Sequence, residues 1–385
     1  MTTGAYLDYN ATAPIRPAVA EAMSRALAET GNASSVHGYG RAQRARIEDA
    51  RDAVARLVGA PPAGLVFTAS GSEANNLALR GAGRRRLLVS AGEHDSVLRA
   101  RSDAETIPIG GDGRVRLDAL EALLLASDEP ALVSVMLANN ETGVIQPVAE
   151  VATLAHAAGA LLHCDAVQAA GRLAVDMAAL GIDMLTLSAH KLAGPQGVGA
   201  LALAPGLEIE ALVRGGGQER RRRAGTENVA GIVGFGVAAE AALGGLKEAA
   251  ALAGLRDELE ARAGALVPEL VIAGAGAPRL PNTSCLAVPG CAAETLVIAL
   301  DLAGVAVSAG SACSSGKVES SHVLRAMGLP EAVAGGAIRV SLGWASRPED
   351  IALFLRAWAA HTERVLERGA PAARESGRTA DPLAL

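Results

Sequence analysis

Short apolar runs alternate along the chain with longer stretches in which apolar residues recur every three or four positions. The short runs have the composition of buried strands, and the stretches between them, such as residues 148–158, have the period of helices. Apolar strands separated by helices are typical of an α/β sheet that is largely parallel and covered on both faces. The predicted strands are residues 65–68, 87–90, 132–137, 160–164, 184–188 and 198–203.

The pattern changes after these strands. A Gly/Arg-rich stretch, residues 214–228, is too irregular for a helix or a strand. The apolar residues 229–246 follow it, and because they include Glu240 we expect a buried helix there rather than a membrane span.

A charged helix over residues 249–266 precedes a region with strands of its own, near residues 284–288 and 338–342. We therefore place a domain boundary at about residue 250. The last residues, 369–385, are rich in Ala, Arg, Ser and Pro, so we expect a loose C-terminal tail.

Composition narrows the possible functions. A chain of 385 residues suggests two or three domains at roughly 150 residues each. The net charge of −6 argues against a broad basic surface for nucleic acid. Two arginine runs, residues 84–86 and 220–223, are local exceptions, and solvated loops would explain both. For residues 220–223 we instead expect positive charge at a subunit interface or at the entrance for substrate.

Cysteine usage and the N-terminus indicate the compartment. The four cysteines are too few for a disulfide scaffold and lack the spacing of a zinc site, which favours reduced thiols. The N-terminal sequence MTTGAYLDYN has neither a basic nor an apolar export segment. We therefore expect a cytoplasmic protein that does not span a membrane.

Lysine is rare, and one lysine has an unusual setting. The chain has three lysines, Lys191, Lys247 and Lys317, among 35 cationic residues. Lys191 directly follows a predicted strand, beside Ser188 and His190 and before a Gly/Pro turn, whereas lysines usually lie among solvated polar residues. An amine shielded from water loses its proton more easily and becomes a nucleophile toward carbonyls.

Two further motifs lie where predicted strands end. Residues 67–77 (FTASGSEANNL) pass from a strand through small residues into a helix near Ser72, a geometry that favours an anion, although Ser70 or Ser72 could equally cap the helix. Asp165 ends the strand before Gln168. A screened carboxylate there needs a cationic partner, such as a heterocyclic N–H⁺ or an arginine, unless Asp165 is a helix cap.

The fourth motif surrounds Cys313 in a Gly/Ser-rich segment, whereas Cys164 and Cys285 lie in apolar runs that predict burial. A thiol in such a segment is suited to visiting a distant substrate, and Lys317 nearby would favour the thiolate. The alternative is an inert loop thiol.

Together, these motifs resemble the cysteine desulfurases of the class V aminotransferase superfamily, which are fold type I pyridoxal-phosphate (PLP) enzymes. The match runs from residues 6–14 (YLDYNATAP) to residues 338–343 (IRVSLG), with the motifs in the expected order. Residues 308–315 (SAGSACSS) and 321–328 (SHVLRAMG) are similar to the desulfurases that have the longer cysteine loop.

The resemblance implies a large α/β domain, residues 14–250, with a mainly parallel seven-stranded sheet between helices. It also implies a smaller α+β domain from residues 1–13 and 251–368, which carries the catalytic cysteine loop, residues 308–322. The expected activity converts L-cysteine to L-alanine with PLP as cofactor and leaves a persulfide on Cys313 for an iron–sulfur scaffold or another sulfur-acceptor protein. A transient iron–sulfur ligand role for Cys313 is a further expectation.

The resemblance also assigns the residues around the cofactor ring. Lys191 would bind PLP covalently and move the Cα proton, and Asp165 would pair with the protonated ring nitrogen. Gln168 would hydrogen-bond the ring hydroxyl, and His94 would stack on the ring and take part in acid–base steps.

Phosphate and substrate contacts follow in the same way. Thr226 would reach the phosphate of the partner subunit, which makes a homodimer the expected active unit. Arg339 would clamp the substrate carboxylate, and Asn140 would contact both cofactor and substrate. The phosphate within the same subunit would be held by Gly71, Ser72, Ser188 and His190.

The sequence departs from the family pattern in small ways: Gly71-Ser72 replaces the frequent Gly-Thr or Ala-Thr, and Ser188-Ala-His replaces Ser-Gly-His. Neither change removes a catalytic group. The alternatives are a selenocysteine lyase, a class V aminotransferase, which would not need the Cys313 thiol, and a sulfur carrier or scaffold without catalysis, against which Lys191, Asp165 and His94 argue.

Overall fold

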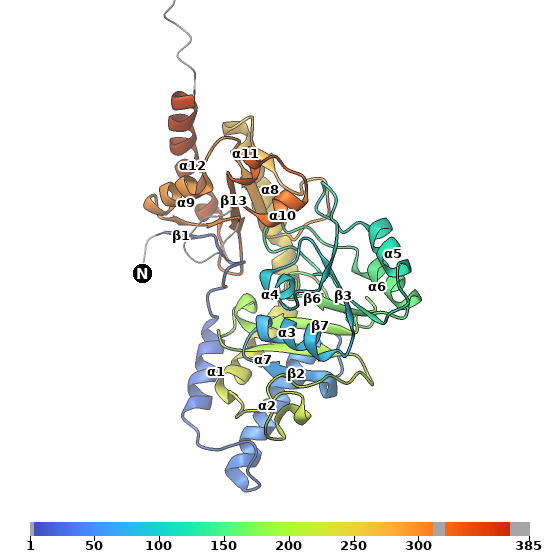
Figure 1. The fold of residues 1–385 in the computed structure, drawn as a ribbon. Coiled ribbons are helices and arrows are strands. Elements are labelled where there is room, and N and C mark those ends of the chain that lie inside the picture. Colours follow the sequence, from blue (N-terminus) through green and yellow to red (C-terminus); the bar gives the residue numbers. More distant parts are fainter. Residues whose placement is uncertain (1–3, 311–319, 370–385) are drawn as a thin grey trace, which may run out of the picture.

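A seven-stranded sheet forms the centre of the larger part of the protein (Figure 1). The computed structural model describes residues 4–310 and 320–369, with side chains described through residue 362. Four of the six strand pairings are parallel, and β8 runs antiparallel to both of its neighbours. The order across the sheet is β2 (Leu65–Thr68), β8 (Gly199–Leu203), β7 (Met184–Ser188), β6 (Leu161–Asp165), β5 (Ala131–Ser134), β3 (Arg86–Ser90) and β4 (Glu105–Ile107).

Alternation along the strands divides the apolar side chains between two helical layers. Val66 packs with α3 (Gly71–Gly81), whereas its neighbours Leu65 and Phe67 pack on the opposite face with α2 (Gly38–Leu57) and α7 (Val229–Gly244). This division follows from the two-residue period of a strand. The same layers also contain α1 (Pro17–Leu27), α4 (Asp95–Leu98), α5 (Leu117–Leu125) and α6 (Val148–Ala157).

A second part of the chain has its own core and sheet. Its antiparallel strands lie in the order β12 (Ser308–Ala309), β13 (Ala337–Ser341), β10 (Thr283–Ala287) and β9 (Val271–Ile272). The N-terminal strand β1 (Ala5–Tyr6) pairs with β11 (Val305–Ala306) beside it. The helices of this part are α8 (Leu246–Leu266), α9 (Ala293–Leu302), α10 (His322–Ala326), α11 (Glu331–Ala334) and α12 (Pro348–Gly369).

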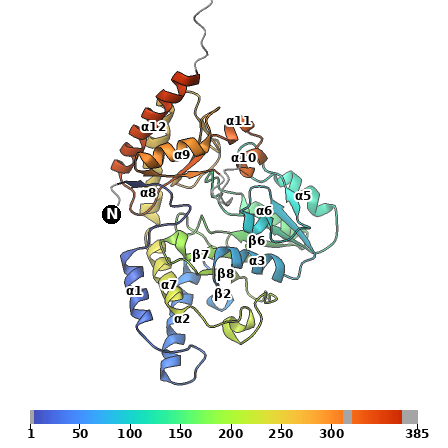
Figure 2. The same cartoon turned by 60° about the vertical axis from the view of Figure 1, so that its left-hand side comes forward.

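The two parts are joined by α8, which runs from the large sheet toward α12 in both views (Figures 1 and 2). Leu259 and Ala263 of α8 pack with Phe354 and Trp358 of α12 in a core separate from that of the large sheet. Separate cores, and the pairing of β1 with β11, support our domain boundaries, which stay a prediction.

Most predicted elements form within a few residues of their expected bounds, and the exceptions have local causes. β5 ends at Ser134, three residues early, although the backbone N–H groups of Val135 and Leu137 still donate to β6. The predicted buried helix ends at Gly244, and α8 begins at Leu246 at an angle of 67° to α7. No single helix in the described ranges is long and apolar enough to cross a membrane, whereas this bent pair meets that criterion jointly.

The Gly/Arg-rich stretch contains an unusual backbone. Glu219, Arg220 and Arg221 have φ values of 45°, 56° and 67°, a left-handed conformation that costs non-glycine residues roughly 1–2 kcal/mol each. The Glu219 carboxylate, whose side chain is 3% exposed, accepts hydrogen bonds from the Arg51 guanidinium at 2.8 and 2.9 Å and from the Phe67 N–H at 2.9 Å. These buried contacts hold the strained turn in place.

Neither arginine run is simply a solvated loop. Arg222 pairs with Glu208 at 3.0 Å, and Arg223 pairs with Glu73 at 2.9 Å. In the first run, Arg86 is the first residue of β3 and is 8% exposed because Glu105 binds its guanidinium at 2.5 and 2.8 Å. The solvated-loop interpretation is therefore wrong for these three arginines.

Removing the Glu219 charge should destabilise the fold markedly. Glu219→Gln leaves the buried Arg51 guanidinium with only the exposed Glu48 carboxylate, at 3.2 Å, as its anion, so we expect the free energy of unfolding to fall by about 3 kcal/mol. Urea unfolding followed by circular dichroism measures this difference. The matched control is Glu240→Gln, which removes the exposed partner of Arg56 and should cost less than ~1 kcal/mol. Equal losses in the two variants would contradict this account of the turn.

Candidate active site

A cavity of about 320 Å³ opens at the carboxyl ends of the parallel strands, where ligands of α/β sheets usually bind. Its volume falls in the ~300–1,000 Å³ range of small-molecule sites. Ten predicted site residues line it: Gly71, Ser72, His94, Asn140, Asp165, Gln168, Ser188, His190, Lys191 and Arg339. Sequence analysis gave no role to other lining residues, among them Asn10, Asn75 and Ser96.

Asp165 is the last residue of β6 and is 7% exposed. Its Oδ1 accepts the Val167 N–H at 2.9 Å, and its Oδ2 accepts the Asn75 side-chain N–H at 2.7 Å. Because a turn rather than a helix follows β6, the helix-cap alternative is wrong. Within the described ranges Asp165 forms no ion pair, so a buried carboxylate faces the cavity without a cation.

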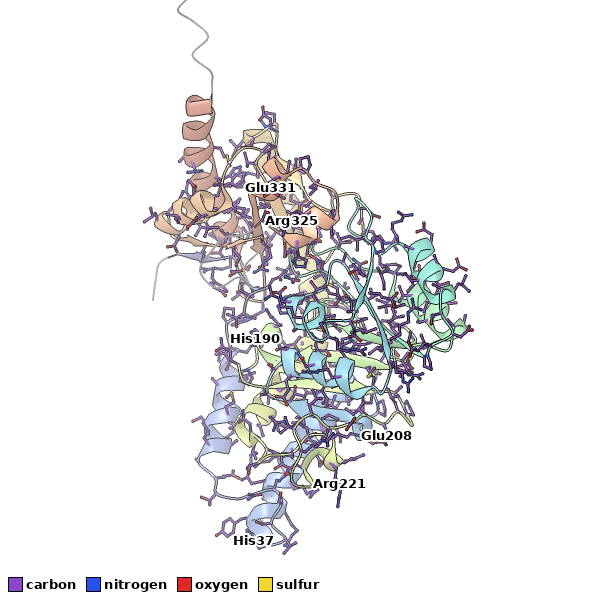
Figure 3. The ribbon with its side chains drawn as sticks, viewed as in Figure 1. His37, His190, Glu208, Arg221, Arg325 and Glu331 are labelled. Atoms are coloured by element: carbon purple, nitrogen blue, oxygen red, sulfur yellow. The ribbon has the colours of Figure 1, made fainter. Side chains whose placement is uncertain are left out.

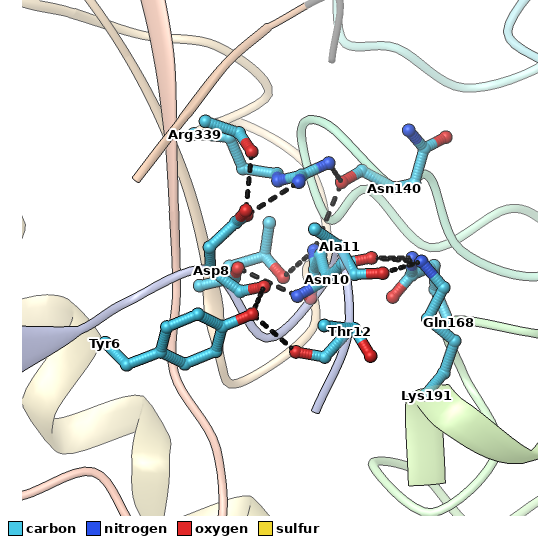
Figure 4. Close-up of polar contacts among 12 residues, drawn as sticks. Tyr6, Asp8, Asn10, Ala11, Thr12, Asn140, Gln168, Lys191 and Arg339 are labelled. Carbon is cyan, nitrogen blue, oxygen red and sulfur yellow. Dashed lines mark hydrogen bonds and ion pairs between the residues drawn. The ribbon is translucent and has the colours of Figure 1, made fainter. Parts of the chain in front are cut away.

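Lys191 lies in a short 3-10 turn, Ala189–Leu192, directly after β7. Its side chain is partly buried, and its Nζ donates to the backbone carbonyl of Ala11 at 2.8 Å and to that of Asn10 (Figure 4). The chain near the N-terminus therefore crosses the cavity and holds the amine. Sequence analysis missed this role of Asn10, because Asn10 and Lys191 are far apart in the chain.

One end of the cavity is suited to an anion. The α3 helix begins there, with Ser70 as its N-cap accepting the Glu73 N–H at 3.1 Å. This confirms the cap, whereas the anion site stays a prediction. The hydroxyls of Ser72 and Ser188 line this end, and within the part of the chain that the structure describes they make no hydrogen bond. Gly71 is closely packed, because a Cβ there would lie 3.1 Å from the Val167 side chain.

His190 lies in the same turn as Lys191, between the two parts of the protein (Figure 3). Burial and the neighbouring Lys191 charge lower the pKa of His190 to about 4, so its ring is neutral near pH 7. Its Nδ1 lies 3.2 Å from the Thr12 hydroxyl. A neutral ring offers one N–H donor to an anion without adding a charge.

His94 follows β3 and faces the same cavity. Its Nδ1 accepts the backbone N–H of Ser96 at 3.1 Å and lies 2.8 Å from the Ser96 hydroxyl. Because Nδ1 accepts, the proton of a neutral ring resides on Nε2. Ser96 also accepts a hydrogen bond from Asn75 at 2.9 Å, which connects His94 to Asp165 through two side chains.

Arg339 reaches the cavity from β13 of the small sheet and is 3% exposed. Its Nη2 donates to Asp8 at 2.8 Å and its Nη1 to the Asn140 carbonyl at 3.1 Å, whereas its buried Nε has no partner among the residues that the structure describes. Asp8 is a site residue that sequence analysis did not identify. The remaining donor capacity of the guanidinium makes it suitable for a small carboxylate.

One predicted site residue lies away from the cavity, and two others are not among the described residues. Thr226 is exposed and lines a different hollow, together with Glu219 and Arg223. Cys313 and Lys317 lie outside the described residues, so the thiol chemistry and the metal-ligand role of Cys313 stay predictions. No group of three or more His, Cys, Asp or Glu side chains in the described ranges could hold a metal ion.

The other thiols are unsuited to catalysis. Cys164 and Cys285 are fully buried, as predicted. Burial raises the pKa of the Cys285 thiol to about 12 and that of the Cys164 thiol well above its usual value. Burial also raises the pKa of Cys291, which is partly exposed.

Two buried carboxyl groups beside the cavity were not expected. Burial and the nearby Asp165 charge raise the pKa of Glu93 well above its usual value, and the Glu93 Oε1 accepts the Met136 N–H at 2.5 Å. Burial raises the pKa of Glu141, which accepts a hydrogen bond from the Ser321 hydroxyl, to about 7. Sequence patterns give no sign of such burial, because glutamates are usually solvated.

The residues of the cavity fit PLP. An unpaired carboxylate, Asp165, suits a protonated ring nitrogen, and the amine of Lys191 suits an aldehyde. The helix start with its two unengaged hydroxyls suits a phosphate. Such a match of charge and donors along one cavity favours this cofactor over an uncharged ligand.

Comparison with known proteins points to the same chemistry. Residues 5–354 match the family model described as aminotransferase class-V. The chain is 48% identical over 360 residues to a cysteine desulfurase of Cereibacter sphaeroides, covering 89% of this chain and 92% of that protein.

Two solved structures are also similar. A NifS-like protein from Rickettsia africae ESF-5 has a TM-score of 0.87 at 34% identity, covering 94% of this chain and 99% of that chain. SspA in complex with cysteine has a TM-score of 0.75 at 30% identity, covering 88% of this chain and 98% of that chain.

Acidification should destabilise the folded protein through His163, which lies on β6 two residues before Asp165. Its ring is fully buried between the hydroxyls of Ser134 (2.8 Å) and Thr186 (3.0 Å), and burial lowers its pKa from 6.5 to about 4. The unfolded chain binds this proton below about pH 6.5 and the folded protein only below about pH 4. His163 therefore favours unfolding as the pH falls through this window, by up to about 3 kcal/mol.

His163→Gln, which does not titrate, should lose less stability than the wild type between pH 7 and pH 4. Urea unfolding at several pH values measures both curves. Parallel curves for the two proteins would contradict the assignment of a neutral buried His163.

Proposed function

Because the chain belongs to the aminotransferase class-V family, we propose that it is a PLP-dependent cysteine desulfurase that converts L-cysteine to L-alanine and keeps the sulfur as a persulfide on Cys313. The match of residues 5–354 to the family model confirms the family identified from the sequence. The observation that carries the proposal is the meeting of Lys191, Asp165 and Arg339 in one cavity, since these groups suit an aldehyde, a pyridinium and a carboxylate.

The cofactor, when bound, supplies an electron sink for the negative charge that develops at the substrate Cα. Asp165 holds the proton on the ring nitrogen, and its hydrogen bonds from Val167 and Asn75 fix the carboxylate before the cofactor arrives. His94 would pack against the ring, with its tautomer set by the Ser96 N–H. Burial of this end of the site excludes water from the ring.

Lys191 has two roles in this proposal. Its Nζ would hold the cofactor through its aldehyde, and the same amine would serve as the base that moves the substrate Cα proton. The carbonyls of Asn10 and Ala11 keep the Nζ in the cavity, so the base stays beside the substrate. Such positioning reduces the entropy cost of the proton transfer.

Arg339 and Asn140 orient the substrate. The guanidinium binds the substrate carboxylate through donors that are not fully used by Asp8 and the Asn140 carbonyl. Asn140 lines the same cavity and would contact cofactor and substrate there. Because Arg339 is buried and anchored by Asp8, the carboxylate is held in one orientation.

The Cys313 thiolate then attacks the substrate sulfur. A sulfur–sulfur bond forms while the carbon–sulfur bond breaks, and the electron pair of the broken bond passes to the substrate carbon skeleton, which is protonated and released as alanine. The other thiols are poor candidates because burial raises the pKa of each of them. The persulfide is delivered to an acceptor protein, which we propose to be an iron–sulfur scaffold or another sulfur acceptor.

The active unit that we propose is a homodimer. Thr226 is exposed and lies outside the cavity of its own subunit, which supports a role toward the phosphate bound in the partner subunit. Arg223 and Glu73 connect the segment before Thr226 to the phosphate turn of its own subunit. This pairing would connect the phosphate site of one subunit to the residue that reaches the site of its partner.

The proposal predicts different losses in two variants of the PLP-loaded protein. With L-cysteine alone, the wild type should form alanine and a reducible persulfide. Cys313→Ser should bind PLP and change its absorption spectrum with cysteine, but form no persulfide. Lys191→Ala should form no alanine. Amino-acid analysis and a persulfide-specific alkylation assay measure the two products.

Cys291→Ser is the matched control, since it removes a partly exposed thiol and should leave both products unchanged. Persulfide on Cys313→Ser would make another cysteine the carrier. Alanine formation by Lys191→Ala, or a requirement for a keto acid in the wild type, would overturn the proposed desulfurase activity.

A further inference from the structure

The Arg172 guanidinium contacts the side-chain amide of Gln168 from a second cavity. Arg172 follows the turn after β6 and lines this cavity of about 610 Å³, on the other side of Gln168 and Lys191 from the cofactor cavity. Its Nη1 donates to the Gln168 backbone carbonyl at 2.6 Å and also to the Gln168 side-chain oxygen. Burial and the Arg339 charge lower the pKa of Arg172 to about 9, so it remains charged near pH 7.

No acidic side chain in the described ranges pairs with Arg172. A shielded cation without an anion is costly. Arg172 is partly buried, and the three buried arginines of the described ranges, Arg51, Arg86 and Arg339, each pair with an anion. The partner of Arg172 is instead a neutral amide that lines the cofactor cavity. The arrangement is therefore better explained by what it does to Gln168 than by stability.

The contacts of Gln168 fix which end of its amide faces the ligand. Its Oε1 accepts from Arg172, and its Nε2 donates to the Asn10 carbonyl at 3.0 Å. Turning the amide over would set N–H groups against the guanidinium and an oxygen against a carbonyl. An amide nitrogen carries two hydrogens, so one N–H of Gln168 remains for a ligand in the cavity.

We propose that Arg172 is a positioning residue that keeps Gln168 as a hydrogen-bond donor toward the ring oxygen of the bound cofactor. This inference rests on the proposed function. A donor stabilises the anionic form of that oxygen, and hence favours the deprotonated state of the cofactor chromophore. Without Arg172 the amide is free to turn its carbonyl toward the same oxygen, which would disfavour that state.

Asn10 ties this arrangement to the catalytic amine. Its carbonyl accepts from both Gln168 and Lys191, so the orientation of the Gln168 amide and the position of Nζ share one acceptor (Figure 4). Other charged or titratable groups also face the cofactor cavity and contribute to the state of the chromophore. They are His94, Asp165, His190, Lys191 and Arg339.

The experiment is a pH titration of the visible absorbance of the PLP-loaded protein without substrate. In Arg172→Met the midpoint should rise by about one pH unit, the equivalent of one hydrogen bond of about 1.4 kcal/mol. Arg172→Lys, which keeps a charged donor, should restore most of the wild-type midpoint. Arg16→Met is the matched control, because Arg16 lines the same second cavity, stacks on Trp344 and has no contact with Gln168.

A double-mutant cycle separates positioning from a direct charge effect. If Arg172 acts through Gln168, Arg172→Met should cause no further change of the midpoint in a Gln168→Leu background. An equal rise in both backgrounds, or no rise in Arg172→Met, would overturn the inference. Each variant is compared at matched PLP occupancy, measured by release of the cofactor in alkali.

Failure of the proposed function gives a different result. A wild-type protein that acquires no visible band with PLP would refute the function itself. A wild type that binds PLP and forms alanine, while the cycle shows no coupling between Arg172 and Gln168, would overturn only the positioning role.

Discussion

The candidate site depends on a buried negative charge, the carboxylate of Asp165 at the end of the central strand β6. Two hydrogen bonds hold it, yet within the described ranges no cation neutralises it. Burial disfavours the charged forms of two neighbouring groups: it lowers the pKa of His163 to about 4 and raises that of Glu93, to which the Asp165 charge also contributes. A single unpaired charge in such surroundings strongly favours a cationic ligand.

The rest of the cavity is assembled from both parts of the chain around this charge. Asn10 connects them: its side chain donates to Thr283 of the small sheet and to the Asn140 carbonyl of the large part, and its own carbonyl accepts from Lys191 and Gln168 (Figure 4). Asp8 anchors Arg339 in the same way. The N-terminal segment thus sets the distance between the amine at the cofactor end and the guanidinium at the substrate end.

Much of this could be predicted from the sequence, because it follows from local patterns. Apolar runs located the central strands, and residues such as Asp165 and Lys191 were recognisable because they directly follow those runs. The antiparallel direction of β8, the role of Asn10 and the burial of Glu93 could not be predicted, since each depends on contacts between distant segments. The left-handed turn at Glu219 could not be predicted either, because it is held by buried contacts of Glu219 with Arg51 and with the Phe67 N–H, both distant in the chain.

The most direct test of the role of Asp165 is the protonation state of the ring nitrogen of bound PLP, measured by nitrogen-15 NMR with cofactor enriched at that atom. The account predicts a protonated nitrogen near neutral pH in the wild type and loss of that proton in Asp165→Asn at matched cofactor occupancy. An unprotonated nitrogen in the wild type, or the same protonated signal in both proteins, would contradict it.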